Sequence, residues 1–356
     1  MATSRDNHYI PQLYLNSWGS DKKIYVHRLL VPHVQYPLWE LRPIKYTAFI
    51  KNLYVRIEDN NEFDDFELDF NSRFETPAKE PLRKAINGER MSPEDWSILS
   101  DYILAQYLRT PSFYFQIQEW GINNVGGILQ SEVERAVELM EKRQLPKAPQ
   151  KAEASLLPIR MELIKGERGS NQSELQATTV VGKNLWLHSI RTLLTPGMGV
   201  YELFHQMKWK IVTAAEEITW PTCDDPVAIV NVDTGRKCTI NDGLSGKNRM
   251  IIFPISPTRA ILGTQKRVFT QHFTADMEFS LRIKQVIINN AFMFIYSNSA
   301  DEAIQASRER IVDLQELQRI QNEFSEWYRK YKESEAPFLS KNNQFINVES
   351  ARGEVR

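Results

Sequence analysis

The stretch NRMIIFPISPTRAILGT, residues 248–264, decides the fold class of this chain. It contains two short apolar runs, 248–256 and 258–264, which are rich in isoleucine and meet at Pro257. Short runs of β-branched and aliphatic residues between turn residues are typical of strands, because such side chains pack well on a pleated surface. The stretch therefore predicts two neighbouring strands of an antiparallel sheet.

Runs of the same character lie on either side of this stretch. KWKIVTA (208–214) and DPVAIVNV (225–232) precede it, and AFMFIYS (291–297) follows a helix that we predict at 275–290. Residues 301–332 are expected to form one long amphipathic helix that closes the sheet. We expect its apolar stripe to pack on the body of the protein, with a homodimeric coiled coil as the alternative.

The first half of the chain predicts strands followed by helices. KIYVHRLL (23–30) and FIKNLYVRI (49–57) have the composition of strands, whereas the acidic segment 58–69 is expected to be a solvated loop. A helix is predicted to start at Ser92, because a proline and an aspartate follow at the positions that are typical of a capped first turn. Further helices are expected at 71–87 and 125–143.

Together these patterns predict an α+β protein. A helical bundle with N-terminal strands packs on a C-terminal antiparallel sheet, and the long C-terminal helix closes it. The 356 residues are enough for one large domain over 1–335. We divide this domain into three parts. N-terminal strands and helices occupy 1–143, and a linker-like insertion occupies 144–182. A helix, the sheet and the long helix occupy 183–335. Residues 336–356 are expected to form a flexible tail.

The composition narrows the class of protein. Lys plus Arg number 44 against 45 Asp plus Glu, so the net charge of -1 provides no global field for nucleic acid or an anionic membrane. The sequence has no signal-peptide pattern and no apolar run of about 18 residues, which a membrane span needs. Cys223 and Cys238 predict buried thiols, with a disulfide between them as the alternative. We therefore expect a cytoplasmic protein without membrane contact.

Four segments resemble one bacterial family. They are NHYIPQLYLNSW (7–18), LAQYLRTP (104–111), ITWPTCDDPVAIV (218–230) and IIFPISPTRAIL (251–262). In order and spacing they resemble the family catalogued as domain of unknown function 4238. Its members combine an Asn-His-Tyr-x-Pro-Gln-like opening with a helix that carries Gln and Arg-Thr and with a Ser-Asp-x-Pro strand end. The resemblance covers most of residues 7–297 and implies a shared fold and a shared site, but no particular reaction.

The chain departs from this family pattern at one place. Cys223, Asp224, Asp225 and Pro226 stand where family members commonly have Ser-Asp-Asn-Pro. A thiol thus replaces the hydroxyl group, and a second acid replaces the amide. A role that needs the hydroxyl group does not carry over to this chain.

The candidates for a functional site are His8, Gln106, Arg109 and Asp224. Near neutral pH an imidazole acts as acid, base or metal ligand, whereas a structural His8 would bind a backbone carbonyl. Gln106 and Arg109 share a face of the predicted central helix, and the guanidinium suits a carboxylate or a phosphate. The structural alternative for Arg109 is a buried ion pair. Asp224 ends a strand, from which its carboxylate would point into a cleft.

The candidate metal ligands are Asp224, Asp225 and Glu75. Paired acids can hold Mg²⁺ or Mn²⁺ for phosphodiester hydrolysis. The alternatives are ordinary turn chemistry for Asp225, which precedes a proline, and a solvated Glu75. The sequence carries no phosphate loop, nucleophile elbow or zinc-binding helix.

The main functional hypothesis is a hydrolase of phosphodiester or nucleotide bonds, such as a nuclease effector in defence against phage. It rests on one base, one guanidinium and acids as the polar groups expected to converge between the helices and the sheet, and it implies nucleic acid or a nucleotide as partner. The competing hypothesis is a non-catalytic sensor or scaffold protein in which the same residues form a buried structural network.

Overall fold

The computed structural model describes residues 6–58, 61–142, 144, 159–165, 173–242, 246, 248–265 and 270–335. The chain contains both helices and strands, and the strands form several sheets. This confirms the predicted α+β class. The predicted tail, 336–356, and residues 145–158 of the linker-like segment lie outside the described residues. No helix within the described ranges is both long enough and apolar enough to cross a membrane.

The elements follow one another in mixed order. The helices, with the short 3₁₀ or π segments written η, are α1 (Gln12–Leu15), η1 (Ile44–Tyr46), α2 (Asp65–Asp69), η2 (Phe70–Glu75), α3 (Thr76–Asn87), α4 (Pro93–Leu108), α5 (Pro111–Glu141), α6 (Lys183–Leu193), α7 (Gly199–Gln206), η3 (Ile240–Asp242), α8 (Met277–Asn290), α9 (Glu302–Ser307), α10 (Leu314–Ser325), α11 (Trp327–Lys330) and η4 (Tyr331–Glu335). The strands are β1 (Asp6–His8), β2 (Lys23–Arg28), β3 (Leu30–Val31), β4 (Glu40–Pro43), β5 (Phe49–Lys51), β6 (Arg56–Glu58), β7 (Asn61–Phe63), β8 (Ile159–Lys165), β9 (Ser173–Thr179), β10 (Lys208–Thr213), β11 (Thr222–Cys223), β12 (Ala228–Asn231), β13 (Arg249–Ser256), β14 (Arg259–Thr264), β15 (His272–Thr274), β16 (Phe294–Ser297) and β17 (Ile311–Val312).

The chain separates into two compact units. The larger unit consists of Met1–Arg56, Glu62–Gln116 and Ile190–Ser325. The smaller unit consists of Ile57–Asn61, Ile117–Ser189 and Glu326–Arg356. One boundary falls inside α5 and not in the predicted linker. That residues 1–335 form a single domain stays a prediction.

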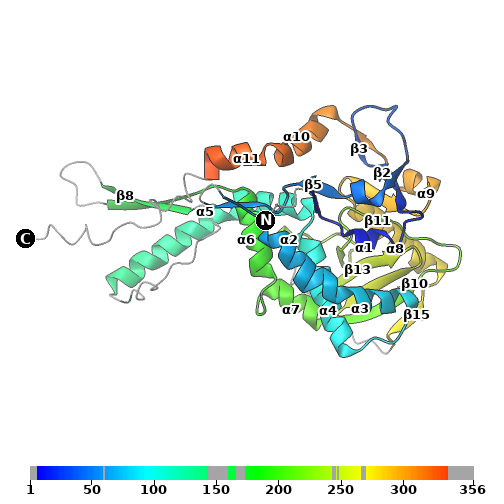
Figure 1. Cartoon of the computed structure of the whole chain (residues 1–356). Helices are drawn as coiled ribbons and strands as arrows, with labels where there is room; N and C mark the ends of the chain where they lie inside the picture. The colour runs from blue at the N-terminus through cyan, green and yellow to red at the C-terminus, as the bar shows by residue number, and fades with distance from the viewer. Residues whose placement is uncertain are drawn as a thin grey trace, which may run out of the picture. The chain divides into compact units, whose positions relative to one another are not determined.

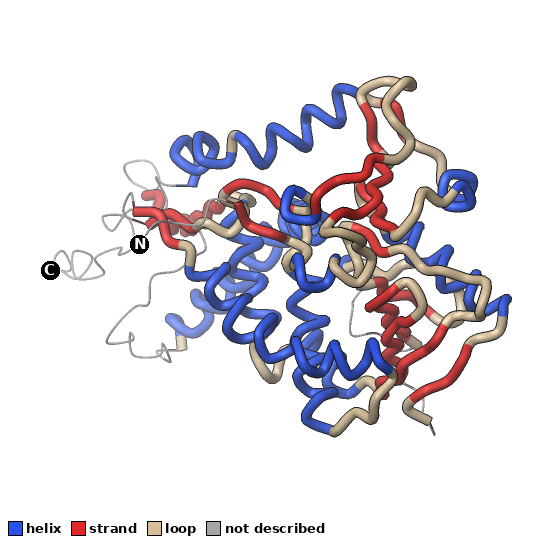
Figure 2. The backbone as a smooth tube through the Cα atoms, turned by 45° about the vertical axis from the view of Figure 1, so that its right-hand side comes forward, coloured by secondary structure: helices blue, strands red, loops and turns tan. Residues whose placement is uncertain are grey.

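The two apolar runs at 248–264 form adjacent strands of a five-stranded sheet in the larger unit (Figures 1 and 2). β13 and β14 pair antiparallel, as predicted. The order of the sheet is β12, β13, β14, β10 and β15, and β15 runs parallel to its neighbour β10. Apolar residues stand at consecutive positions of β13 and β14, so both faces of the sheet need cover.

Helices cover both faces of this sheet. On one face, Ile283 of α8 packs in a buried cluster with Val212 and Leu262. On the other face, the ring of Tyr102 on α4 lies 6.1 Å from the ring of Phe253. The hydrophobic core of the larger unit is therefore built on the sheet that the sequence predicts, with α4 and α8 as its two covers.

A second, four-stranded sheet joins the two ends of the larger unit's sequence. Its order is β11, β16, β2 and β4, and each neighbouring pair is antiparallel. The register places Phe294 opposite Arg28 and Tyr296 opposite Val26, so these four side chains share one face. The strand predicted at 291–297 therefore exists, and it pairs with an N-terminal strand.

The predicted helix start at Ser92 is confirmed in detail. The Ser92 hydroxyl accepts a hydrogen bond from the Asp95 backbone, and the Asp95 carboxylate accepts one from the Ser92 backbone. Loss of such a cap typically costs about 1 kcal/mol. α4 ends at Leu108, so the chain turns toward α5 at Arg109.

Two segments in the first two thirds of the chain contain elements that the sequence does not predict. Within the linker-like insertion, 144–182, β8 and β9 form an antiparallel pair. Within the acidic segment, 58–69, the described residues form β7 and α2, and Phe66 is buried. β8 has charged residues at alternate positions, and α2 has acids in its first turn. Both segments are therefore polar in composition, and a search for apolar runs does not find them.

The single long helix predicted at 301–332 is also wrong. The chain forms α9, the two-residue strand β17, then α10 and α11. β17 pairs parallel with β3, because the backbone N–H groups of Ile311 and Asp313 donate to the carbonyls of Leu29 and Val31, at 2.6 and 3.1 Å. The helical spacing of apolar residues over 301–332 gives no sign that β3, which is distant in the sequence, pairs with the backbone in the middle of this segment.

Candidate functional site

The first site residue, His8, lies on β1, which pairs with β5. Its Nε2 atom is 3.3 Å from the carbonyl of Lys45, and its ring lies 5.8 Å from the ring of Phe49. Burial lowers the pKa of the imidazole, so the neutral form prevails near pH 7. The geometry thus matches the structural role, in which His8 binds a backbone carbonyl, and its own carbonyl has a second partner in Arg109.

Arg109 is almost completely buried at the end of α4. Its guanidinium donates to the Glu75 carboxylate at 2.6 Å, to the Tyr54 hydroxyl at 3.3 Å and to the His8 carbonyl. It also lies over the ring of Phe70, 4.4 Å from the ring centre. Burial alone would lower the pKa of Arg109, but the nearby charges raise it above its ordinary value. The guanidinium is therefore charged and occupied by protein groups.

Gln106 lies one turn earlier on the same face of α4. Its Nε2 atom donates to the Tyr9 carbonyl at 2.8 Å, and its Oε1 atom has no hydrogen-bond partner among the described residues. Gln106 and Arg109 therefore hold two consecutive carbonyls of the N-terminal segment, those of Tyr9 and His8. This accounts for the polar interruption of an otherwise apolar helix face.

Glu67 on α2 belongs to the same group of residues, and the sequence does not predict it. Burial raises its pKa to about 7, and the positive charge of Arg109 opposes this rise while Glu75 adds to it. The one sequence signal is its position between two buried phenylalanines, Phe66 and Phe70, in a segment that composition alone marks as solvated. We call Tyr54, Glu67, Glu75, Gln106 and Arg109, with the backbone of His8, the Arg109 cluster.

Asp224 follows β11 and is also buried. Its two carboxylate oxygens accept hydrogen bonds from the backbone N–H groups of Phe292 and Met293, at 2.8 and 2.7 Å. Burial raises the pKa of Asp224 to about 7 in spite of these hydrogen bonds, and the negative charge of Asp225 adds to the rise. Asp224 thus fixes the loop between α8 and β16 without forming an ion pair with any described cation.

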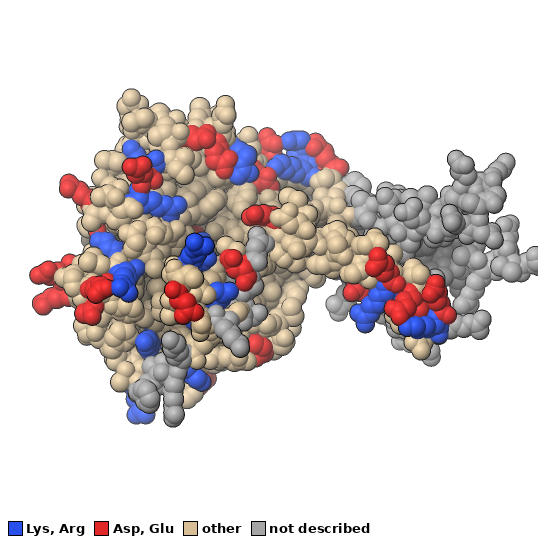
Figure 3. All heavy atoms as spheres, turned by 180° about the vertical axis from the view of Figure 1, so that it is seen from behind, with Lys and Arg blue, Asp and Glu red and all other residues tan. Residues whose placement is uncertain are grey.

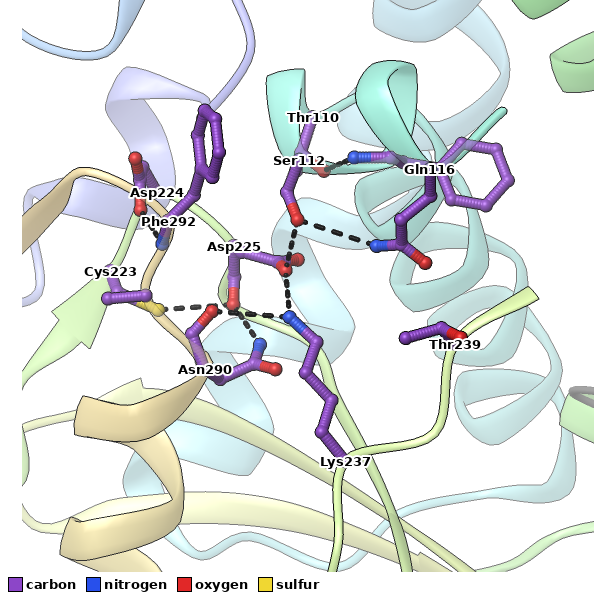
Figure 4. A network of polar contacts seen from close by, with 12 residues as sticks. Thr110, Ser112, Gln116, Cys223, Asp224, Asp225, Lys237, Thr239, Asn290 and Phe292 are labelled. Carbon is purple, nitrogen blue, oxygen red and sulfur yellow. Dashed lines mark hydrogen bonds and ion pairs between the residues drawn. The ribbon is translucent and has the colours of Figure 1, made fainter. Parts of the chain in front are cut away.

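The neighbouring acid, Asp225, lies in a separate polar network (Figure 4). Its Oδ2 atom accepts from the Ser112 hydroxyl and from the Lys237 ammonium, both at 2.8 Å, while its backbone carbonyl accepts from Asn290. The Cys223 thiol donates to the same carbonyl at 3.1 Å. Asp225 therefore joins the start of α5 to the strand ends, which is more than the turn chemistry expected of an acid before proline.

The three predicted metal ligands do not come together. Glu75 pairs with Arg109, Asp225 pairs with Lys237, and Asp224 binds backbone N–H groups. Among the described residues, no group of three or more His, Cys, Asp and Glu side chains is placed to hold a metal ion. The prediction that these three carboxylates share one metal ion is therefore wrong. Cys223 and Cys238 are both buried free thiols, as predicted.

Of the four predicted site residues, three meet in the Arg109 cluster. Tyr9 lies between Asp224 and this cluster. The Tyr9 carbonyl accepts from Gln106, and the pKa of the Tyr9 phenol is raised mainly by burial and further by the negative charge of Asp224. Tyr9 and Asp224 both border a cavity, whereas the side chains of His8, Gln106 and Arg109 do not. The four residues expected in a single pocket thus lie at two distinct sites, the Arg109 cluster and the cavity that Asp224 borders.

This cavity has a volume of about 380 Å³ and lies wholly within the larger unit. One wall is the face of the four-stranded sheet that carries Val26, Arg28, Phe294 and Tyr296. The opposite wall is a stripe of α10 with helical spacing: Leu317, Ile320, Gln321, Phe324 and Ser325. We call it the α10 cavity.

The remaining lining of the α10 cavity combines aromatic rings with cations. The segment 46–51 contributes Tyr46, Phe49 and Lys51, and β4 contributes Arg42. Arg28 is paired with Glu40 at 3.3 Å, whereas Arg42 and Lys51 form no ion pair with any described residue. Asp224 is the one acidic residue among the described lining side chains. The cavity is therefore apolar and aromatic, with two available cations and one buried carboxylate.

The comparisons with known proteins agree with the sequence pattern. The model of the family described as Protein of unknown function (DUF4238) matches residues 6–301 of the chain. Since this range covers most of the chain, the protein belongs to that family. No curated protein and no solved structure matches the chain.

Proposed function

We propose that this member of the DUF4238 family is a non-catalytic sensor that binds a nucleotide in the α10 cavity. The observation that carries the proposal is the lining of the cavity, where aromatic rings, cations and one carboxylate surround a volume of about 380 Å³. Ligand sites are typically concave and mostly apolar, with a few polar groups that orient the ligand. The α10 cavity has this composition.

The aromatic walls suit a flat base. Phe49, Phe292, Phe294 and Phe324 line the cavity from different elements. Stacking of a base on an aromatic side chain contributes about 1 to 3 kcal/mol and tolerates different bases. A nucleobase therefore matches these walls better than a saturated ligand of the same size.

The cations suit a phosphate group. Arg42 and Lys51 come from neighbouring segments and have no ion-pair partner among the described residues, so their charges are available to an anion. On the face drawn in Figure 3, by contrast, basic and acidic side chains are interspersed, and the net charge of the chain is -1. A broad basic surface for a nucleic acid duplex would need a single-sign patch. These features favour a nucleotide as the ligand.

The Arg109 cluster supports the non-catalytic half of the proposal. Arg109 binds Glu75, Tyr54 and the His8 carbonyl, so its donors are already used by protein groups. The neutral imidazole of His8 binds the Lys45 carbonyl. Residues that would form the catalytic group of a nuclease are thus used in joining α4 to the N-terminal segment.

One observation favours a second candidate function, the hydrolysis of phosphodiester or nucleotide bonds. The pKa of Asp224 is raised to about 7 by burial, and Asp224 borders the cavity. A carboxyl group with a pKa near the working pH is suited to act as general base. In this second proposal Asp224 would activate water beside the bound nucleotide, and a nuclease role in phage defence stays a prediction.

Calorimetric titration of the full chain with AMP, GMP, CMP and UMP tests the main proposal. We expect binding of at least one of them, and an affinity at least about 10-fold lower after combined Arg42→Ala and Lys51→Ala substitution, because the phosphate loses both charges. Arg83→Ala is the matched control, since Arg83 is an exposed cation that pairs with Glu80 and Glu89. If no nucleotide binds at millimolar concentration, the proposal is wrong.

The second candidate needs a separate assay. Purified chain is incubated with single-stranded DNA, RNA and the same nucleotides, with and without Mg²⁺ or Mn²⁺. Hydrolysis that disappears in Asp224→Asn, while the variant still binds nucleotide, would support a hydrolase. Unchanged nucleotides in every condition would leave the sensor as the remaining proposal.

A further inference from the structure

The inner end of the α10 cavity contains a carboxylate with unused hydrogen-bonding capacity. Each oxygen of the Asp224 carboxylate accepts one backbone N–H, from Phe292 at 2.8 Å and from Met293 at 2.7 Å, and the backbone N–H of Phe294 also interacts with this carboxylate. An ionised carboxylate has about four acceptor positions, so roughly one remains open. No described side chain donates a hydrogen bond or forms an ion pair with Asp224. Asp224 is one of the residues that line the cavity.

Two tyrosines complete this polar end. Tyr9 and Tyr296 are buried, line the cavity and interact with one another through their hydroxyl groups. Burial raises the pKa of both phenols above the ordinary value, and the negative charge of Asp224 raises both further, so both stay neutral. The end of the cavity therefore presents neutral hydroxyl groups and an acceptor-rich carboxylate inside aromatic walls.

The polar end and Arg42 lie at opposite edges of one sheet. Asp224 directly follows β11, the first strand in the order β11, β16, β2 and β4, and Arg42 lies on β4, the last. Neighbouring strands are about 4.8 Å apart, so three spacings separate the two edges by roughly 14 Å. A nucleotide lying across this sheet would reach Asp224 with its base and the long side chain of Arg42 with its phosphate.

From this arrangement we propose that the α10 cavity selects nucleobases that carry an exocyclic amino group, whose N–H groups donate to Asp224. This inference rests on the proposed function, that the cavity binds a nucleotide. Adenine and cytosine bring an amino group to the edge where hypoxanthine and uracil bring a carbonyl oxygen. A carbonyl oxygen facing the ionised carboxylate would place two acceptors against one another with no hydrogen between them, which is unfavourable in a buried place.

The discriminating experiment compares pairs of ligands that differ at this one group. AMP is titrated against IMP, and CMP against UMP, into the full chain by calorimetry at about pH 8.5, where Asp224 is ionised because its pKa is raised only to about 7. We expect AMP and CMP to bind at least about 10-fold more tightly than IMP and UMP, since a buried acceptor that faces another acceptor is unfavourable. Because both ligands of a pair carry the same phosphate and ribose, the ratio reports the contact with the base alone.

Two variants separate this inference from the proposed function. Asp224→Asn replaces one acceptor by a donor, so the preference for the amino base should fall or reverse. Arg42→Ala should weaken all four ligands by a similar factor and leave the ratio unchanged. Circular dichroism checks that the Asp224→Asn variant is folded, and the affinity ratios of the native chain test the selection of the base without any variant.

The possible outcomes are distinct. A preference for AMP over IMP that is lost in Asp224→Asn supports the inference. Equal affinities within each pair would overturn the role of Asp224 in selection, while nucleotide binding itself would stand. Failure of every nucleotide to bind would overturn the proposed function and this inference together.

Discussion

Arg109 and Asp224 are both almost completely buried, and both lie in segments of the family pattern, yet their surroundings are opposite. Arg109 has a carboxylate, a phenol and a carbonyl as partners and does not border the α10 cavity. Asp224 has only backbone N–H groups as donors to its carboxylate among the described residues, and it borders the α10 cavity. A buried charge with a full set of partners is typical of a structural role, whereas one with open positions at a cavity is typical of a binding site.

The largest expected effect is at Arg109. Arg109→Met would leave Glu75 and the His8 carbonyl without their partner, and removal of one member of a buried ion pair costs about 3 to 5 kcal/mol. We expect a large drop in the free energy of unfolding, measured by urea denaturation. Arg83→Ala, at a fully exposed pair, should have a much smaller effect, because solvent screens that ion pair. Equal effects of the two variants would contradict the structural role of Arg109.

A smaller effect is expected at Lys237, which is about one third exposed. Lys237→Met leaves the Asp225 carboxylate buried with Ser112 as its remaining side-chain donor among the described residues, so we expect a loss of about 1 to 2 kcal/mol. The double variant with Asp225→Asn should recover most of this loss, because the amide carries no charge. A double variant less stable than Lys237→Met would show that the ion pair is not the cause.

The pH dependence of stability tests the two raised carboxyl groups. The pKa of Asp224 rises from an ordinary 3.8 to about 7, and that of Glu67 from 4.5 to about 7, in both cases mainly through burial. The folded state thus binds more protons than the unfolded state between about pH 4 and 7, and stability falls as the pH rises through this window. Urea denaturation at several pH values should show this slope, and Asp224→Asn and Glu67→Gln should each reduce it. A stability that rises from pH 4 to pH 7 by the same amount in all three proteins would contradict the assigned shifts.

The smallest effect is expected at Cys223. Cys223→Ser replaces the thiol with a hydroxyl group, and the Asp225 carbonyl that now accepts from the thiol at 3.1 Å can accept from the hydroxyl. The change should alter the free energy of unfolding by no more than about 1 kcal/mol. A larger loss, measured by urea denaturation, would show that the apolar contacts of the thiol with Ile288 and Ile295 dominate at this position.

The sequence predicts the parts of the fold that local patterns determine. The apolar runs at 248–264 become β13 and β14, and the capped start at Ser92 is present in detail. It does not predict β17, because two residues of strand arise only through pairing with β3, far away in the sequence. It also does not predict β8 and β9, because their polar composition resembles that of a linker.

The sequence predicts the candidate site only in part, for the same reason. The pairing of His8, Gln106 and Arg109 follows from their positions on β1 and on one face of α4. Glu67 escapes prediction, because its burial depends on the packing of Phe66 and Phe70 and not on its neighbours in sequence. The metal prediction is wrong because each acid has a different partner in three dimensions, which composition cannot show.

The central claim is that the α10 cavity, and not the Arg109 cluster, is the ligand-binding site. A crystal structure of the chain with AMP tests this claim most directly. We predict that the nucleotide lies between α10 and the face of β2 and β16, with its base at Asp224 and its phosphate at Arg42 and Lys51. The contacts of Arg109 with Glu75 and His8 should be unchanged. A nucleotide bound by Arg109, or anywhere outside the α10 cavity, would contradict this account.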